Sequence, residues 1–156
     1  MTVRLDHLAL AAHDAQESAR FLAEILDLPE PRSAPPFIAV DVDDTLTIDF
    51  AVPPVEFPGQ HVAFHLSDDE FDAVRARLEA RGITYWPGPG YREPNTINEN
   101  HGGRGLYFDD PGGHHFEILT ARYEGSPGRE TFLAVRPCAA GSAPSRSRGR
   151  RRGPAA

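Results

Sequence analysis

The sequence lacks several residue types from which small sites are often built. Cys138 is the one cysteine among 156 residues, which excludes an intrachain disulfide framework and a zinc module made of several cysteines. Lysine is absent, so all 16 basic residues are arginine. No stretch approaches the roughly 20 apolar residues of a membrane span. The first residues also lack the apolar run and cleavage site of a secretory signal. We therefore expect a cytoplasmic protein with no membrane partner.

Charge is distributed unevenly along the chain. The formal net charge is −7, yet residues 137–156 contain five arginines and no acidic residue. The acidic body, residues 1–136, is a poor platform for phosphate backbones, so we expect no nucleic-acid partner. Its composition predicts one folded domain. Residues 137–156 have few apolar side chains and are predicted to form a disordered Arg-rich tail, with an electrostatic arm as the alternative.

The body contains an internal repeat. Residues 3–10 and 57–66 both alternate between apolar and polar side chains, as half-buried strands do. The pattern His, apolar, Ala, apolar occurs at 7–10 in the first strand and at 61–64 in the second. Each predicted strand is followed by apolar residues at helical spacing, which predicts one helix in each half.

Capping residues mark where these helices begin. Asp14 is the predicted N-cap of the first helix. Ser67 is that of the second, and Glu70 three residues later completes a capping box. The second helix is predicted to end at Arg81-Gly82.

Short predicted strands follow each helix. They cover 37–41 and 45–51 in the first half, and 84–86, 105–108 and 115–120 in the second. The halves, about 1–54 and 57–123, each contain a strand, a helix and further strands. The sequence therefore predicts an α+β fold made of two similar modules.

Three residues occupy positions that suit a metal. His7 and His61 lie at matched places in the first strands, and Glu117 lies in the last strand. Two imidazoles and one carboxylate can hold a divalent ion and leave coordination positions open. The spacing also allows a structural interpretation, in which these histidines only make hydrogen bonds within the sheets.

The segments LDHLAL, HVAFHL and FDDPGGHHFEILT carry a resemblance to a known family. Over residues 3–123 the chain resembles the vicinal oxygen chelate superfamily, which includes glyoxalase I, extradiol dioxygenases and bleomycin-binding proteins. The resemblance implies paired βαβββ modules around a U-shaped metal cleft, with His7, His61 and Glu117 as ligands. A fourth ligand of the glyoxalase kind falls near Asp49. It also implies a homodimer whose sites combine His7 of one subunit with His61 and Glu117 of the other.

Residues 85–109 resemble a bacterial subgroup typified by the dioxygenase-like enzyme of chartreusin biosynthesis. This resemblance implies a metal-dependent dioxygenase that opens or rearranges an aromatic, polyketide-like small molecule. It implies Fe²⁺ as the metal and O₂ as co-substrate, with Mn²⁺, Ni²⁺ or Zn²⁺ as other metals. A glyoxalase-like lyase or isomerase and a non-catalytic drug-binding resistance protein stay open. Fosfomycin transferases match the ligands, but they bind the phosphonate with a lysine and with serines of the loop before the penultimate strand. This chain has no lysine, and its 87–104 loop has no serine.

The segment 87–104 is an 18-residue stretch rich in proline, glycine and asparagine. Loops of this length are commonly functional, so we expect a lid that brings Arg92, Asn98 and Arg104 to the substrate. His101 is a candidate general base because its ordinary pKa lies near neutrality. From the resemblance, Tyr107 faces the substrate and takes part in catalysis. The alternative for the loop is a hydrated surface segment.

Overall fold

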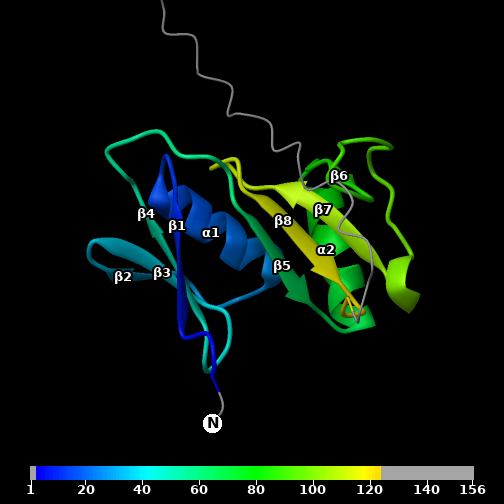
Figure 1. Ribbon diagram of the computed structural model, residues 1–156, viewed down its shortest axis with the longest axis horizontal. Coiled ribbons are helices and arrows are strands. Elements are labelled where there is room, and N and C mark those ends of the chain that lie inside the picture. The colour runs from blue at the N-terminus through cyan, green and yellow to red at the C-terminus, as the bar shows by residue number, and fades with distance from the viewer. Residues whose placement is uncertain (1–2, 124–156) are drawn as a thin grey trace, which may run out of the picture.

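The computed structural model describes residues 3–123, which form two modules of the same design (Figure 1). The first contains β1 (His7–Ala11), α1 (Ala15–Leu26), β2 (Arg32–Ala34), β3 (Phe37–Asp41) and β4 (Thr47–Ala51). The second contains β5 (His61–His65), α2 (Asp68–Ala80), β6 (Tyr85–Trp86), the 3-10 turn η1 (Asn100–Gly102), β7 (Gly105–Asp109) and β8 (His115–Leu119). The predicted α+β fold with two βαβββ modules is confirmed.

Each module forms one four-stranded sheet, in the orders β1-β4-β3-β2 and β5-β8-β7-β6. In each sheet the first strand lies at an edge and runs parallel to the last strand of the module. The registers also match, because Ala9 pairs with Asp49 in the first sheet and Ala63 pairs with Glu117 in the second. The sequence repeat is therefore a structural repeat, and equivalent positions can be compared directly.

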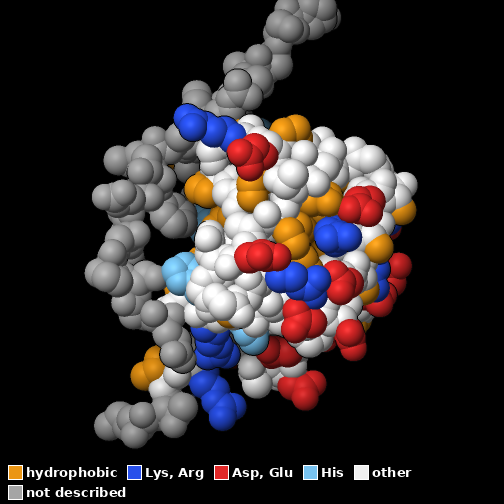
Figure 2. Space-filling model, turned by 90° about the vertical axis from the view of Figure 1, so that its right-hand side faces the viewer, with side chains coloured by type: hydrophobic (Ala, Val, Ile, Leu, Met, Phe, Trp, Pro, Cys, Tyr) orange, Lys and Arg blue, Asp and Glu red, His pale blue; other side chains and the backbone are white. Residues whose placement is uncertain are grey.

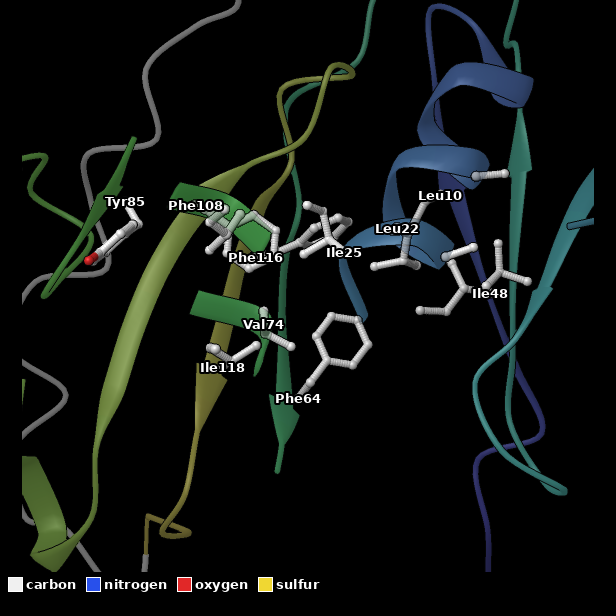
Figure 3. Packing of buried hydrophobic residues seen from close by; sticks show 14 of the residues in the cluster. Leu10, Leu22, Ile25, Ile48, Phe64, Val74, Tyr85, Phe108, Phe116 and Ile118 are labelled. Atoms are coloured by element: carbon white, nitrogen blue, oxygen red, sulfur yellow. The ribbon is translucent and has the colours of Figure 1, made fainter. Parts of the chain in front are cut away.

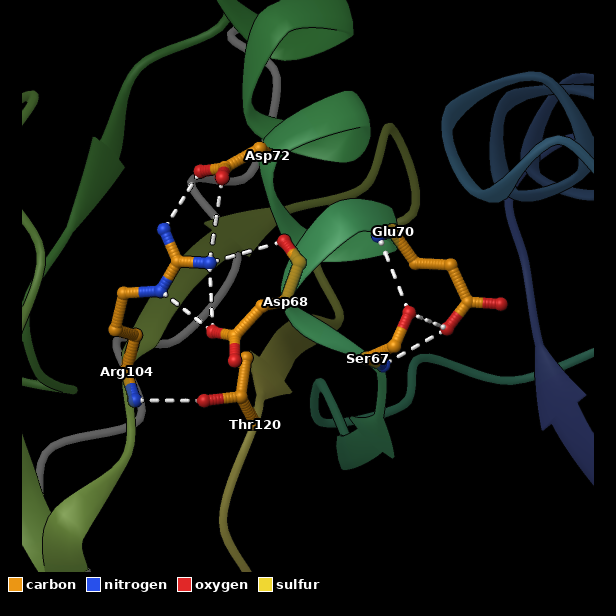
Figure 4. Close-up of polar contacts among 6 residues, drawn as sticks. All are labelled: Ser67, Asp68, Glu70, Asp72, Arg104 and Thr120. Atoms are coloured by element: carbon orange, nitrogen blue, oxygen red, sulfur yellow. Dashed lines mark hydrogen bonds and ion pairs between the residues drawn. The ribbon is translucent and has the colours of Figure 1, made fainter.

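Both helices begin at the predicted caps. The Asp14 side chain accepts hydrogen bonds from the second and third amides after it, at the start of α1. Ser67 and Glu70 form the predicted capping box at the start of α2 (Figure 4). These side chains satisfy amides for which a helix start has no partner of its own. The predicted end of α2 is confirmed as well, since Gly82 follows it with a φ of 65°.

The core lies between the two sheets, and α1 fills much of it (Figure 3). Leu22 and Ile25 of α1 are fully buried. They lie between Ile48 of the first sheet and Phe116 of the second. Each sheet therefore turns one face toward the helices. The opposite face of each sheet carries the candidate metal ligands, because side chains alternate along a strand.

A buried histidine connects the modules. His114 follows the turn Asp110–Gly113, in which Gly113 has a φ of 82°. Nε2 of His114 donates a hydrogen bond to the carbonyl of Ala11 at 2.5 Å, and Nδ1 accepts one from the amide of Gln60 at 3.0 Å. Because Ala11 ends β1, the ring holds the β7–β8 turn of the second module against the first.

Asp110 lies beside this histidine with a carboxylate that is only partly satisfied. It is 5% exposed, and its Oδ1 accepts the amide of His114 at 2.7 Å. Its Oδ2 is buried without a hydrogen-bond partner among the described residues. Burial raises the pKa of Asp110, and the hydrogen bonds and charge around it offset this only in part. The folded state therefore holds the proton more tightly than the unfolded state, and ionisation above pH ~4 costs stability.

Asp110→Asn should consequently be more stable than the original chain at pH 7, by about 1 kcal/mol. The amide keeps an acceptor for the His114 N–H and carries no charge. At pH 3 the advantage should disappear, because the carboxyl is then neutral in both the folded and the unfolded state. Urea unfolding at the two pH values measures the difference, with the exposed Asp44→Asn as control. An Asn variant that is no more stable at pH 7 would contradict this account of Asp110.

The structure also differs from the sequence prediction in places. It adds β2, which pairs with β3 and is supported by an ion pair of Arg32 with Asp41 at 3.2 Å. The first strand begins only at His7, since Val3 and Leu5 before it are exposed. Within residues 3–123 no helix is long and apolar enough to cross a membrane. The tail predicted for 137–156, with Cys138, lies outside the described residues.

Candidate metal centre

The outward face of the second sheet brings together residues from three neighbouring strands. Ala63 of β5 and Tyr107 of β7 are the register partners of Glu117 in β8. His61, two residues before Ala63, lies on the same face. Glu117 is 1% exposed and Tyr107 is 6% exposed. Ala63 has only a methyl side chain, which leaves His61 and Glu117 unobstructed toward each other.

His61 and Glu117 are in direct contact. Nε2 of His61 lies 3.2 Å from Oε2 of Glu117. The other ring nitrogen, Nδ1, lies 3.0 Å from the carbonyl oxygen of His115, and a carbonyl can only accept, so Nδ1 carries the proton. Unless it is also protonated, Nε2 then presents a lone pair to a carboxylate oxygen. Two acceptors at this distance need a positive charge between them, either a proton or a metal ion.

Two tyrosines hold Glu117 from the other side. The hydroxyl of Tyr123 donates to Oε1 of Glu117 at 2.5 Å, and the hydroxyl of Tyr107 lies 3.2 Å from that of Tyr123. Burial alone raises the pKa of Glu117, but the hydrogen bond that His61 donates when Nε2 is also protonated, together with those from Tyr123 and Tyr107, outweighs it, so the pKa lies below its ordinary value. Burial raises the pKa of both phenols. At neutral pH Glu117 is therefore an anion and the tyrosines are hydrogen-bond donors.

The side chain of another histidine, His115, lies on the same face as His61. Nδ1 of His115 is 2.6 Å from Oδ1 of Asp109, which also accepts the Tyr91 hydroxyl at 3.2 Å. The His115 ring stacks on Tyr107, with centroids 5.3 Å apart, and the Tyr91 ring covers it at 5.0 Å. Trp86 meets Tyr91 edge-on at 4.8 Å. The carboxylate and phenols thus lie on an aromatic surface.

The first sheet carries the equivalent positions. His7 corresponds to His61, and Asp49 corresponds to Glu117, since each carboxylate pairs with the alanine two residues after the histidine. Nδ1 of His7 is 2.9 Å from Oδ2 of Asp6, and its side chain is 61% exposed. The Asp6 hydrogen bond, with the charges of Asp6 and Asp49, raises the pKa of His7. His7 is accordingly an exposed side chain with a ring nitrogen beside a carboxylate.

The three predicted ligands do not all meet within one chain. In the described part of the chain no three His, Cys, Asp or Glu side chains form a metal-binding group. His61 and Glu117 are together, whereas His7 and Asp49 lie on the other sheet. The donor set at His61 and Glu117 nevertheless fits a divalent ion, because it offers an imidazole lone pair and a carboxylate already oriented by hydrogen bonds.

The loop residues predicted to bind substrate lie in different places. The Asn98 side chain donates to the carbonyl of Pro87 at 2.7 Å and so closes the loop on itself. Arg92 is exposed. The His101 ring meets Tyr123 edge-on at 4.5 Å, which places it at the margin of the Glu117 site. The structure therefore brings His101 close to the site and gives Asn98 a part in shaping the loop.

Arg104 lies away from Glu117, because residues alternate along β7 and it falls on the helix side of the sheet. Its guanidinium bonds Asp68 at 2.7 Å and Asp72 at 2.6 Å, and it lies over the Phe71 ring at 4.7 Å (Figure 4). The role predicted for Arg104 in substrate binding gains no support from this geometry. Figure 2 shows the side of the molecule that lies at the right of Figure 1, where arginines and acidic side chains are interspersed.

Sequence reasoning did not single out Tyr123 or Asp109 as site residues. Tyr123 lies after the last strand, where no strand pattern indicates which way its side chain points. Asp109 becomes significant only through its cross-strand pairing with His115. The alternation of β7 and β8 was the available signal for Asp109, once the register of the two strands is known.

The fold and the site together define a class: two βαβββ modules with a histidine–carboxylate pair on the outward face of a sheet. Residues 4–118 match the sequence model of the Glyoxalase/Bleomycin resistance protein/Dioxygenase superfamily. The chain belongs to this superfamily, the vicinal oxygen chelate family.

Individual relatives agree with this assignment. The chain is 32% identical over 124 residues to the Glutathione transferase FosA of Serratia marcescens, covering 76% of this chain and 81% of that protein. Two solved structures are similar to this chain, each with a TM-score of 0.76. Oxidase ChaP-H1 is 45% identical and covers 80% of this chain and 100% of its own. Oxidase ChaP-H2 is 47% identical, with 82% and 100% covered.

Proposed function

We propose that the chain is a metal-dependent oxygenase acting on an aromatic, polyketide-like small molecule with vicinal oxygens. The observation that carries the proposal is the contact of His61 Nε2 with Glu117 Oε2 at 3.2 Å on an aromatic face. The similarity to two proteins named oxidases, at 45% and 47% identity, supports oxidation over the other chemistries of the superfamily.

His61 and Glu117 would hold the metal, for which Fe²⁺ is our choice. A divalent ion held by these residues would supply Lewis-acid polarisation of vicinal substrate oxygens. Other groups of the chain orient these two ligands. The carbonyl of His115 fixes the tautomer of His61, and the hydroxyl of Tyr123 fixes the orientation of Glu117.

The same face would position the substrate. The rings of Trp86, Tyr91 and Tyr107 offer a surface on which an aromatic molecule can stack. The hydroxyl of Tyr107 remains protonated and, by turning away from the Tyr123 oxygen, would donate a hydrogen bond to a phenolate or enolate oxygen, while the hydroxyl of Tyr123 continues to donate to Glu117. His101, edge-on to Tyr123, is our proposed general base, and Arg92 and Asn98 belong to the loop that would cover the substrate.

We propose a homodimer in which a second copy supplies His7 to each site. His7 is exposed and lies on the other sheet from Glu117. The strands that carry His7 and His61, β1 and β5, are edge strands that pair on one side only within residues 3–123, so the other side of each would meet the second copy. Asp49, which corresponds to Glu117, would be the fourth ligand of such a shared site.

An oxygen-electrode experiment tests the reaction class. Protein stripped of metal and reloaded with Fe²⁺ under argon should consume O₂ when given dihydroxynaphthalenes or hydroxylated anthraquinones. Glu117→Gln should reduce the rate at least 100-fold, because it removes the anionic ligand. The exposed Glu56→Gln should leave it unchanged.

The alternatives give different results in the same experiment. Conversion of the substrate without O₂ uptake would replace the proposal with a glyoxalase-like lyase or isomerase. Tight binding with the ligand returned unchanged would replace it with a drug-binding resistance protein.

A further inference from the structure

The outward face of the second sheet contains a polar atom that the metal centre does not use. His115 is 7% exposed, and its Nε2 is buried without a hydrogen-bond partner among the described residues. Buried imidazole nitrogens are almost always paired, because an unpaired one loses its hydration without compensation. An orphaned nitrogen on a ligand-binding face indicates a partner that arrives with the ligand.

The surroundings of His115 determine what that partner must be. Asp109 Oδ1 lies 2.6 Å from Nδ1 and can only accept as a carboxylate, so Nδ1 carries the proton. The Tyr91 hydroxyl reinforces this arrangement, since it donates to the same oxygen at 3.2 Å. With the ring proton on Nδ1, Nε2 is the acceptor atom of the ring, and its missing partner is a donor such as a hydroxyl group.

Two aromatic rings pack against the His115 ring. Tyr107 stacks on it with centroids 5.3 Å apart, and the tilted Tyr91 ring lies at 5.0 Å. Nε2, at the edge of the ring, is the atom left for a partner. Tyr91 belongs to the 87–104 loop, the segment whose displacement would admit a ligand to this atom.

We propose that His115 Nε2 accepts a hydrogen bond from a phenolic hydroxyl of the bound substrate and so selects hydroxylated rings over their ethers. Asp109 is the positioning residue, because it fixes the tautomer that makes Nε2 an acceptor. This inference rests on the proposed function for the aromatic nature of the substrate, but it needs neither metal nor turnover. It adds a specificity determinant beside the His61–Glu117 pair.

Binding of a diol and of its ether to the metal-free protein tests the proposed role of His115. Trp86 is the one tryptophan of the chain and lies 4.8 Å from Tyr91, so its fluorescence reports on ligands at this face. In EDTA under argon, 1,2-dihydroxynaphthalene should bind more tightly than 1,2-dimethoxynaphthalene. His115→Phe keeps an aromatic ring but has no acceptor. It should weaken the diol about tenfold and leave the ether unchanged, as loss of one buried hydrogen bond predicts. His65→Phe, on the same sheet face, should affect neither probe.

A second variant keeps the test independent of the ring replacement. Asn at position 109 can donate to Nδ1, which favours the other tautomer and makes Nε2 a donor. Asp109→Asn should therefore reduce the preference for the diol, and long-range ¹H–¹⁵N correlation spectra should show the proton moving from Nδ1 to Nε2.

Several results would overturn the inference. These are equal affinity of the original chain for diol and ether, no binding of the diol, equal weakening of both probes by His115→Phe, or a protonated Nε2 in the free neutral protein. His61→Ala separates this inference from the proposed function. It should abolish metal binding while the diol preference of the metal-free protein persists.

Discussion

Two inactive variants should complement each other if the metal site is shared between two chains. His7→Ala and Glu117→Ala should each lose tight binding of a divalent ion. Co-expressed with different tags and purified as a heterodimer, they should bind one ion per dimer. In that heterodimer one site combines the intact His7 of one chain with the intact His61 and Glu117 of the other. The second site lacks His7 and Glu117 and keeps only His61. The metal content per chain, measured after gel filtration, should therefore be about half that of the original dimer.

The matched control pairs His61→Ala with Glu117→Ala. Both substitutions lie on the second sheet, so every site of their heterodimer lacks one of these two ligands and no binding should return. Recovery in the control, absence of recovery in the test pair, or a monomeric mass by light scattering would each contradict a site shared in this way. Metal binding by the His7→Ala chain alone, with unchanged affinity, would remove His7 from the ligand set.

Phe116→Ala should cause the largest loss of stability, about 3–5 kcal/mol of unfolding free energy. Phe116 is fully buried where α1 meets the second sheet (Figure 3). It makes edge-to-face contacts with Phe64 at 5.9 Å and with Phe108 at 5.8 Å. Removing the ring leaves a cavity that both modules line, so relaxation around it should be limited.

Guanidinium unfolding of the metal-free protein measures this loss. The exposed Val55→Ala is the control and should change the free energy by no more than about 0.5 kcal/mol. A Phe116→Ala loss below about 1 kcal/mol would mean that the two modules do not share a tightly packed core at this position.

Local signals in the sequence predicted much of the fold. The caps at Asp14 and Ser67 depend on neighbouring residues only, and both are confirmed. The repeat at His7 and His61 predicted the matched sheets, because a duplicated pattern of alternation buries equivalent side chains in each half. By contrast, β2 (Arg32–Ala34) has no apolar alternation. It forms through pairing with β3, which no local pattern reveals.

The site was less predictable, for reasons of topology. That His61 meets Glu117 follows from a parallel pairing of β5 with β8, which the strand patterns leave undetermined. The Asp109–His115 pair depends in the same way on the β7–β8 register. Arg104 was assigned to the substrate because its loop is polar, whereas the acidic start of α2 holds it on the helix side. For His7 the decisive neighbour would belong to a second copy of the chain.

The central claim is that His61 and Glu117 hold a divalent metal ion. Anaerobic titration of stripped protein with Fe²⁺, Mn²⁺, Ni²⁺ and Zn²⁺, alongside His61→Ala, tests it most directly. We expect one tight site per chain in the original protein and loss of that site in His61→Ala. No saturable site, or identical titrations of the two proteins, would mean that the contact at 3.2 Å is only a structural ion pair.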